Sequence, residues 1–176
     1  GTAESFNGTR VFKMKMGLPQ LPPELEGLTI LQLSDSHLGI YRFLDDWEAV
    51  LTEAATYKPD LVLLTGDIAD DLSLLPDPLK MTDDLTPPCV IYASLGNHEY
   101  YRGVERVKRI FGHSQIPLLI REGVNISVKG KSVFVAGADD PRYMNEDTSV
   151  FLNDTVNKAV LTAKNADFAI LMSHRP

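Results

Sequence analysis

Four short segments of the chain are apolar almost throughout, and each has the length of a β-strand that is buried on both faces. These segments are Leu28–Leu33, Leu61–Leu64, Cys89–Ala93 and Phe168–Met172. The segment Thr9–Met16 alternates between apolar and polar residues, which is the period of a half-exposed strand. Three further strands, joined by turns at Glu122-Gly123 and Lys129-Gly130, are predicted in succession at Ile116–Ile120, Val124–Val128 and Ser132–Ala138.

Apolar residues at helical spacing predict helices at Phe43–Tyr57, Gly103–Gly112 and Thr148–Lys164. The segment Asp70–Pro88 is acidic and holds four prolines, so it is predicted to be a loop with a short helix. Strands that alternate with helices indicate an α/β protein in which helices cover the sheet on both faces. The sequence thus predicts three or four layers.

The composition is that of an ordinary globular protein, with 44% hydrophobic and 23% charged residues. A length of 176 residues is enough for one domain with its own core. The formal net charge of -7 argues against a nonspecific nucleic-acid binder, which needs a basic surface. The single cysteine, Cys89, lies in an apolar run and cannot form an internal disulfide.

The sequence leaves both a cytoplasmic and a membrane-associated location open. No apolar run approaches the roughly 18 residues of a membrane-spanning helix, and residues 1–10 lack the pattern of a signal peptide. The opening Gly1-Thr2-Ala3 is typical of a cloning remnant. Further sequence upstream, including a membrane anchor, is therefore compatible with this chain.

Each of the four apolar strands is followed by polar side chains of the types that can bind metal ions. Because the carboxyl ends of the strands in an α/β sheet form the ligand crevice, these side chains should converge there. The candidates are Asp35, His37, Asp67, Asn97, His98 and His174. Each motif is weak when taken alone, and the prediction of a shared site depends on their conjunction. The remaining histidine, His113, follows Gly112 and is predicted to be a solvated loop residue.

Carboxylates and imidazoles together form a mixed oxygen and nitrogen donor set. Such a set suits Mn, Fe or Zn, suits Mg less well, and does not resemble an oxygen-only calcium site. Asp67 could bridge two ions about 3.5–4 Å apart with its two oxygens. Gly66 and Gly96 would let the backbone turn sharply beside the ions. The residues therefore predict a divalent-metal site, and Asp67 would suit a site with two ions.

The motifs occur in a specific order, namely Asp35-x-His37, Gly66-Asp67-x-x-Asp70, Gly96-Asn97-His98-Glu99 and Ser173-His174. This set resembles the calcineurin-like metallophosphoesterase family. The flanking segments Pro59-Asp60-Leu61-Val62 and Tyr100-Tyr101 are similar to the bacterial branch of small, often membrane-associated phosphoesterases. The resemblance covers about Leu28 to His174.

The resemblance implies a four-layer αββα fold and hydrolysis of a phosphate mono- or diester by a metal-bound hydroxide. Asp35 and His37 would bind the first ion, Asp67 would bridge, and Asn97 and His174 would bind the second. His98 and Asp70 would be the catalytic pair, with His98 as the general acid and Asp70 as the residue that orients it. Glu99 would have a supporting role or begin a helix.

The chain departs from the family pattern at one place. The family has a Gly-His-x-His element downstream of the Ser-His strand, whereas this chain stops at Pro176. Each of the two histidines in that element would add a ligand to one ion. We therefore expect residues 1–176 to be a single, truncated domain that lacks its C-terminal strands.

Two alternatives stay open from the sequence. One is a metal-binding fragment or pseudo-enzyme without turnover, and the other is a nuclease of the same superfamily. The residues Tyr100, Tyr101 and Arg102 could contact the substrate or serve only in packing. The acidic segment 139–141 could line the crevice, although a turn is the better interpretation.

Overall fold

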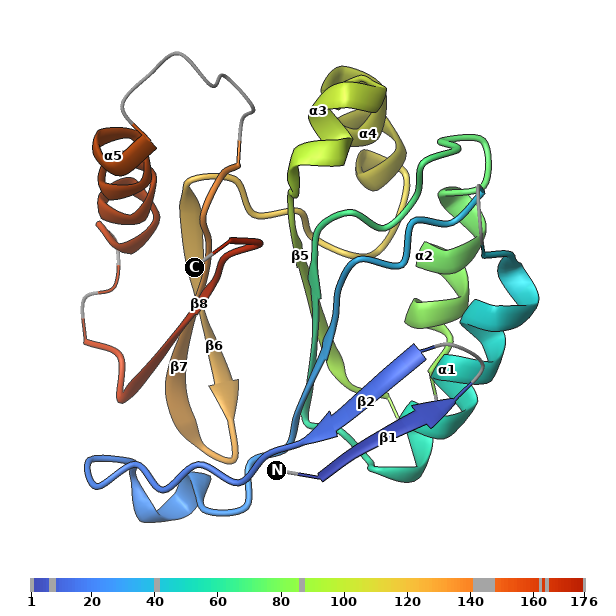
Figure 1. Cartoon of the computed structure of the whole chain (residues 1–176). Helices are drawn as coiled ribbons and strands as arrows, with labels where there is room; N and C mark the ends of the chain where they lie inside the picture. Colours follow the sequence, from blue (N-terminus) through green and yellow to red (C-terminus); the bar gives the residue numbers. More distant parts are fainter. Residues whose placement is uncertain are drawn as a thin grey trace.

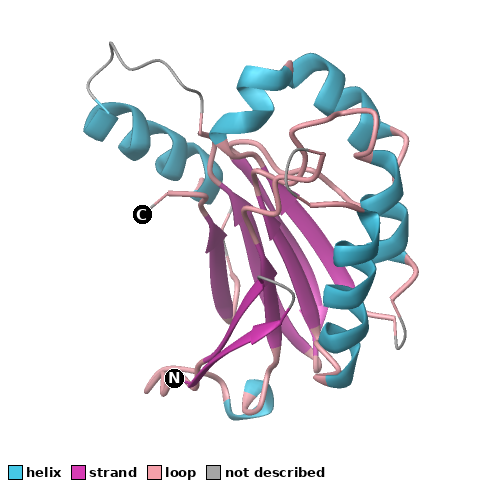
Figure 2. Cartoon of the chain, turned by 45° about the vertical axis from the view of Figure 1, so that its right-hand side comes forward, coloured by secondary structure: helices cyan, strands magenta, loops and turns pink. Residues whose placement is uncertain are grey.

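Two β-sheets lie face to face between helices in the computed structural model, with α5 outside one sheet and α1 and α2 outside the other (Figure 1). The strands form the centre of the molecule and the helices cover it (Figure 2). The structure describes residues 2–6, 9–39, 42–85, 88–140, 148–161, 163 and 165–175.

The first sheet is parallel, with the strand order β3 (Ile30–Leu33), β4 (Leu61–Thr65) and β5 (Val90–Ser94). The second sheet is mixed. Its strands are β6 (Glu122–Val128), β7 (Lys131–Gly137) and β8 (Phe168–Met172), with β6 antiparallel and β8 parallel to β7. The strands β1 (Thr2–Phe6) and β2 (Thr9–Lys13) form a separate antiparallel hairpin.

The helices are α1 (Leu44–Thr56), α2 (Pro76–Asp83), α3 (Asn97–Arg102), α4 (Val104–Gly112) and α5 (Thr148–Val160), with a short 3-10 helix at Pro23–Leu25. The indole N–H of Trp47 in α1 donates to the carbonyl of Pro78 and to the hydroxyl of Thr82, both 3.2 Å away. These bonds satisfy a buried donor and fix α1 against α2.

The alternation of side chains along two strands accounts for the layers. On β4, Val62 and Leu64 pack against the helices, whereas Leu61 and Leu63 pack against the second sheet. On β7, Val133 and Val135 face the first sheet, and Phe134 and Ala136 face α5. The segments Leu61–Leu64 of β4 and Val133–Ala136 of β7 are apolar throughout because they are buried on both faces. The predicted four-layer αββα arrangement is confirmed.

Several predicted boundaries agree with the structure. The strand at Phe168–Met172 has the predicted ends, and the turn at Lys129-Gly130 joins β6 to β7. Both turn residues have positive φ, 49° and 78°, as a two-residue hairpin of type I′ requires. The helix predicted in the acidic segment 70–88 is α2.

The prediction of a strand at Ile116–Ile120 is wrong. The segment pairs with β5 only at Ala93, whose N–H donates to Pro117 O and whose carbonyl accepts from Leu119 N–H. Pro117 has no N–H and cannot extend a ladder. The turn predicted at Glu122-Gly123 is also wrong, because both residues lie within β6. The pattern likewise missed β1 and α3, and the strand at residue 9 ends at Lys13.

Phe134 gives a direct test of the layer between β7 and α5. Its side chain is 1% exposed, and its ring covers Gly123, where a Cβ atom would lie 2.3 Å from the ring Cζ. Phe134→Ala should lower the free energy of unfolding by about 3–5 kcal/mol, because it removes buried apolar surface and leaves a cavity. Urea unfolding measures the change.

Phe12→Ala is the matched control, because Phe12 is 67% exposed. Its free energy of unfolding should change by less than about 0.5 kcal/mol. Similar losses for the two variants would contradict the packing of α5 on β7.

Candidate metal centre

The carboxyl ends of β3, β4, β5 and β8 present the predicted residues at one edge of the sheets. Their side-chain atoms form a continuous set of contacts around Asp67 and Asp70, made by His37 after β3, His98 at the start of α3 and His174 after β8. Asp35 joins the set through His174, at 4.0 Å. Residues more than a hundred positions apart thus lie side by side.

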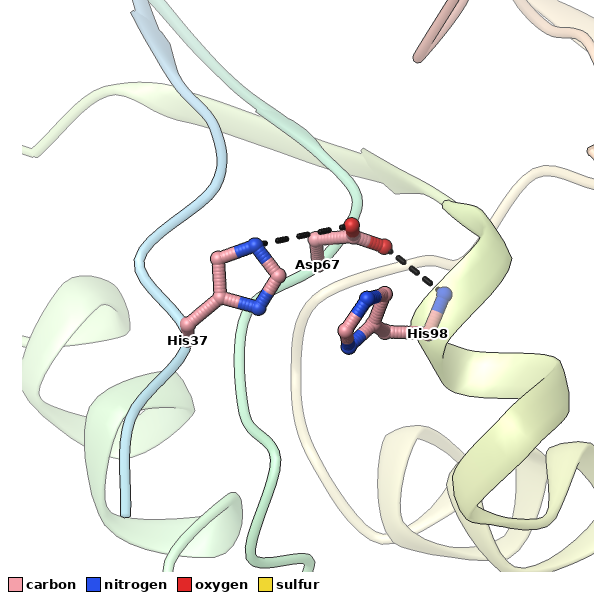
Figure 3. Close-up of side chains that lie close together, drawn as sticks. All are labelled: His37, Asp67 and His98. Atoms are coloured by element: carbon pink, nitrogen blue, oxygen red, sulfur yellow. Dashed lines mark hydrogen bonds and ion pairs between the residues drawn. The ribbon is translucent and has the colours of Figure 1, made fainter. Parts of the chain in front are cut away.

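Asp67 is the centre of the set and is only 3% exposed. One carboxylate oxygen, Oδ2, lies 3.3 Å from His174 Nε2 and 3.7 Å from His37 Nε2. The other, Oδ1, accepts a hydrogen bond of 2.9 Å from the backbone N–H of His98 (Figure 3). Burial raises the pKa of Asp67, but the bonds from His174 and from His98 N–H outweigh it and hold the pKa below its usual value.

The backbone is strained where it delivers these side chains. Asp35, His37 and Asp67 have φ of 56°, 45° and 53°, in the left-handed region that L-residues rarely adopt. Such conformations cost about 1–3 kcal/mol each and concentrate at functional sites. The hydrogen bonds Asp35 N–H to Gly66 O and His37 N–H to Asp67 O hold the first two residues in this conformation.

Two glycines allow the loop after β4 to touch the loop after β5. A Cβ atom on Gly66 would lie 2.3 Å from Gly96 N, and one on Gly96 would lie 2.3 Å from Asp67 Oδ1. Neither neighbour can move, because one is backbone and the other is the central carboxylate. Glycine is therefore required at both positions for Asp67 and α3 to meet.

Glu99 ties the same two loops together and is 2% exposed. Its Oε2 accepts from Asp67 N–H at 2.9 Å and from Gly96 N–H at 2.8 Å, and its Oε1 accepts from Ile68 N–H at 3.0 Å. Gly96 precedes the first turn of α3, so the bond to Gly96 also caps this helix. This geometry agrees with the supporting, helix-starting role expected for Glu99.

Asp70 contacts both histidines beside Asp67. Its Oδ1 lies 2.7 Å from His98 Nδ1, and its Oδ2 lies 3.2 Å from His37 Nδ1. Burial raises the pKa of Asp70, but His98 and Arg102, whose Nε is 3.1 Å away, hold it below the usual value. An ionised Asp70 accepts hydrogen bonds from both Nδ1–H groups, which leaves each Nε2 with its lone pair in the neutral ring.

His174 is oriented in the same manner by a carbonyl. Its Nδ1 lies 2.9 Å from Thr65 O, so Nδ1 carries the donated proton and Nε2 faces Asp67 and Asp35. The hydrogen bond with Asp67 outweighs the burial of the ring and raises the pKa of His174 to about 9. This site therefore favours a positive charge close to Asp67.

Two groups of three side chains could each hold an ion, and Asp67 belongs to both. One group is Asp35, Asp67 and His174, and the other is His37, Asp67 and His98; within each, the ligand atoms lie within 4.8 Å of one another. Two ligand atoms on one ion, each ~2.1 Å from it, are ~3–3.5 Å apart. The distances of 3.3 and 3.7 Å at Asp67 are close to this spacing, so the residues fit divalent ions.

These groups differ from the division implied by the resemblance, which placed Asp35 with His37 and His174 with Asn97. Asn97 is the first residue of α3, immediately after Gly96, and is partly buried. The N–H of the next residue, His98, donates to Asp67 Oδ1. The assignment of each residue to one ion stays a prediction.

The three residues after Glu99 hold the site in place. Tyr100 O–H donates to Asp139 Oδ1 at 2.6 Å, the Tyr101 ring packs edge-to-face on His98 with centroids 5.5 Å apart, and Arg102 pairs with Asp70. Burial and the contact with Asp139 raise the pKa of Tyr100. A contact of this segment with the substrate stays a prediction.

Two acidic residues after β7 form pairs that the sequence did not predict. Asp139 and Asp140 are 6% and 3% exposed. Arg121 Nε donates to Asp139 Oδ2 at 3.0 Å, and Arg175, next to His174, binds both oxygens of Asp140. Pro141 lies outside the described residues. The adjacent residues Asp139 and Asp140 were the only sequence feature that pointed to these ion pairs. Their arginine partners lie in distant segments of the chain.

Comparisons with known proteins agree on one family. Residues 28–176 match the sequence profile described as calcineurin-like phosphoesterase. The chain is 32% identical over 169 residues to an uncharacterized metallophosphoesterase of Aquifex aeolicus, which covers 95% of the chain and 62% of that protein. It is 28% identical over 138 residues to a Bos taurus protein named "Transmembrane protein with metallophosphoesterase domain", covering 74% of the chain and 31% of the relative.

A solved structure has the same fold. The NAD nucleotidase of Haemophilus influenzae superposes with a TM-score of 0.54 and 18% identity, over 83% of this chain and 34% of the other. The chain spans less than two thirds of the length of each of these proteins.

Glu99→Gln tests the clamp between the loops. An amide can present only one oxygen, so at least one backbone N–H would face an N–H donor in a buried place. The free energy of unfolding should fall by about 2–3 kcal/mol, as expected for an unsatisfied buried group next to a lost charged acceptor. Urea unfolding measures the stability and Mn²⁺ titration measures the ion affinity, and both should decrease.

Glu105→Gln, at an exposed position of α4, is the control and should change neither quantity. A Glu99→Gln protein with the stability and ion affinity of the wild type would refute the clamp.

The His174–Asp67 pair predicts how the metal-free protein responds to pH. The pKa of His174 is about 9 when folded and ~6.5 when unfolded. Its contribution is therefore complete below pH ~6.5 and disappears as the pH rises through about 9. In the presence of a chelator, the free energy of unfolding should fall by about 3 kcal/mol across this range.

Urea unfolding at a series of pH values measures the effect. His174→Gln should remove this decrease, whereas His113→Gln, at an exposed ring, should keep it. A wild-type stability that does not change from pH 6.5 to 9 would show that the pair contributes nothing.

Proposed function

The chain belongs to the calcineurin-like phosphoesterase family, and on that basis we propose that it hydrolyses a phosphate mono- or diester at a centre of two divalent ions. The observation that carries the proposal is the position of Asp67, a buried carboxylate with imidazoles on two sides. A carboxylate so placed is suited to bridge two ions. The formal net charge of -7 favours a small phosphate ester over a nucleic acid.

Five residues would hold the ions, namely Asp35, His37, Asp67, Asn97 and His174. We assign Asp35 and His37 to the first ion and Asn97 and His174 to the second, with Asp67 shared. The mixture of carboxylate, amide and imidazole donors favours Mn, Fe or Zn over Mg. When bound, such ions would lower the pKa of a water molecule that they hold and would place positive charge opposite the phosphate oxygens.

His98 would give a proton to the leaving oxygen. Asp70 holds its Nδ1 at 2.7 Å, and the ring packs edge-to-face against His37, with centroids 4.5 Å apart, and against Tyr101. The ring is thereby fixed in one orientation with Nε2 available for proton transfer. Arg102 pairs with Asp70 and, together with His98, holds the pKa of Asp70 below its usual value, so Asp70 remains a hydrogen-bond acceptor for the His98 ring.

The location of the whole protein is a separate question. Among the described residues, no helix reaches both the length and the apolar character needed to cross a bilayer. One relative is a transmembrane protein by name. Fractionation of the full-length protein decides between the cytoplasmic and membrane-associated locations that the sequence left open.

Asp67→Asn tests the shared ligand. Turnover of bis(4-nitrophenyl) phosphate and 4-nitrophenyl phosphate with Mn²⁺ should fall by more than about 100-fold, because the loss of a ligand exceeds the usual effect of altering a neighbour of one. Asp45→Asn, in the first turn of α1, is the control and should keep wild-type activity. Metal uptake without any turnover that depends on Asp67 would favour the alternative of a binding module.

His98→Gln tests the proposed acid. The rate should fall by about 10²–10⁴-fold for phenyl phosphate, whose leaving group needs a proton, and by much less for 4-nitrophenyl phosphate. Metal content, measured on the same sample, should stay near that of the wild type. Equal losses on the two substrates, or loss of metal, would assign His98 to ion binding instead.

A further inference from the structure

A groove of about 650 Å³ lies between α2 and α4, and it shares no residue with the candidate metal centre. On α2 it is lined at positions spaced by three and four residues, Pro76, Leu79, Lys80 and Asp83. This spacing places the four side chains on one helical face. Its volume falls within the range of about 300–1,000 Å³ typical of small-molecule sites.

The facing side of the groove has the same spacing on α4, at Arg106, Arg109, Ile110 and His113. The neighbouring positions Val107 and Phe111 point into the core. His113 directly follows the last residue of α4 and is exposed, as predicted; its Nδ1 donates to Arg109 O at 2.8 Å. The helices α2 and α4 therefore each present one stripe of side chains to the open groove between them.

The stripes combine an apolar floor with cationic side chains. Leu79 and Ile110 pack on the core from either helix, and the aliphatic stems of the arginines extend the apolar surface. Arg106, Arg109 and Lys80 outnumber the single carboxylate, Asp83. Lys80 already pairs with Asp84, and the Asp71 carboxylate interacts with Arg106, so Arg109 and, in part, Arg106 carry the positive charge of the groove. The sign is opposite to that of the chain, whose formal net charge is -7.

We propose that this groove binds a single-chain anionic amphiphile, in which an apolar body lies on Leu79 and Ile110 and a carboxylate or phosphate pairs with Arg106 and Arg109. Arginine suits both head groups because its planar N–H groups bind two oxygens at once. An uncharged apolar ligand would contact only the apolar floor, and an inorganic anion would pair only with the arginines. The site does not depend on turnover at the metal centre.

Calorimetric titration with decanoate, below its micelle concentration, tests the proposal on the unaltered protein. Decanoate should bind with a stoichiometry of one, decan-1-ol should bind about tenfold or more weakly, and acetate should show no binding up to about 1 mM. Decanol binding as tight as decanoate binding, or no saturable decanoate binding, would overturn the proposal.

The double variant Arg106→Gln/Arg109→Gln locates the site. Its affinity for decanoate should fall about tenfold or more, with the circular dichroism and melting temperature of the wild type. Lys108→Gln removes one positive charge from α4 outside the groove, where Lys108 pairs with Glu105, and should change the affinity less than about twofold. A folded double variant that binds decanoate like the wild type would place the ligand elsewhere; if it does not fold, the comparison of decanoate with decanol decides.

Discussion

Glu99 accepts hydrogen bonds from Asp67, Ile68 and Gly96 backbone N–H groups, and this buried carboxylate joins the end of β4 to the start of α3. The contact is possible only because Gly66 and Gly96 bring their backbones together without side chains. Asp67 keeps its left-handed φ within this clamp. The candidate centre therefore depends first on the hydrogen bonds that Glu99 makes between the loop after β4 and the loop after β5. The residues that would face an ion are positioned by these bonds.

The buried carboxylates at this edge of the sheets explain its electrostatic character. Asp67, Asp70, Glu99, Asp139 and Asp140 are each almost fully buried, and each has a histidine, arginine, tyrosine or backbone N–H partner. Buried charges without such partners would cost several kcal/mol each. Asp67 differs from Asp139 and Asp140 because its positive partner is a histidine rather than an arginine, and a histidine can exchange its proton for a metal. A divalent cation would replace that positive charge.

The sequence predicted the parts of this protein that local pattern determines. The strand Phe168–Met172 and the turn at Lys129-Gly130 follow from periodicity and turn chemistry, and the candidates at the strand ends follow from the rule that such ends meet. The short helix α3 was missed because its cap comes from Glu99 after a glycine rather than from a typical capping side chain. The segment at 116–120 was overpredicted because its apolar content reflects burial beside β5, not pairing. The partners of Asp139 and Asp140 lie at Arg121 and Arg175, and no local pattern contains such distant pairs.

Anomalous diffraction from a crystal of this protein grown with Mn²⁺ tests most directly whether Asp67 is shared by two ions. The account predicts two peaks about 3.5–4 Å apart, one on each side of the Asp67 carboxylate. A single peak, or two peaks of which only one contacts Asp67, would contradict it.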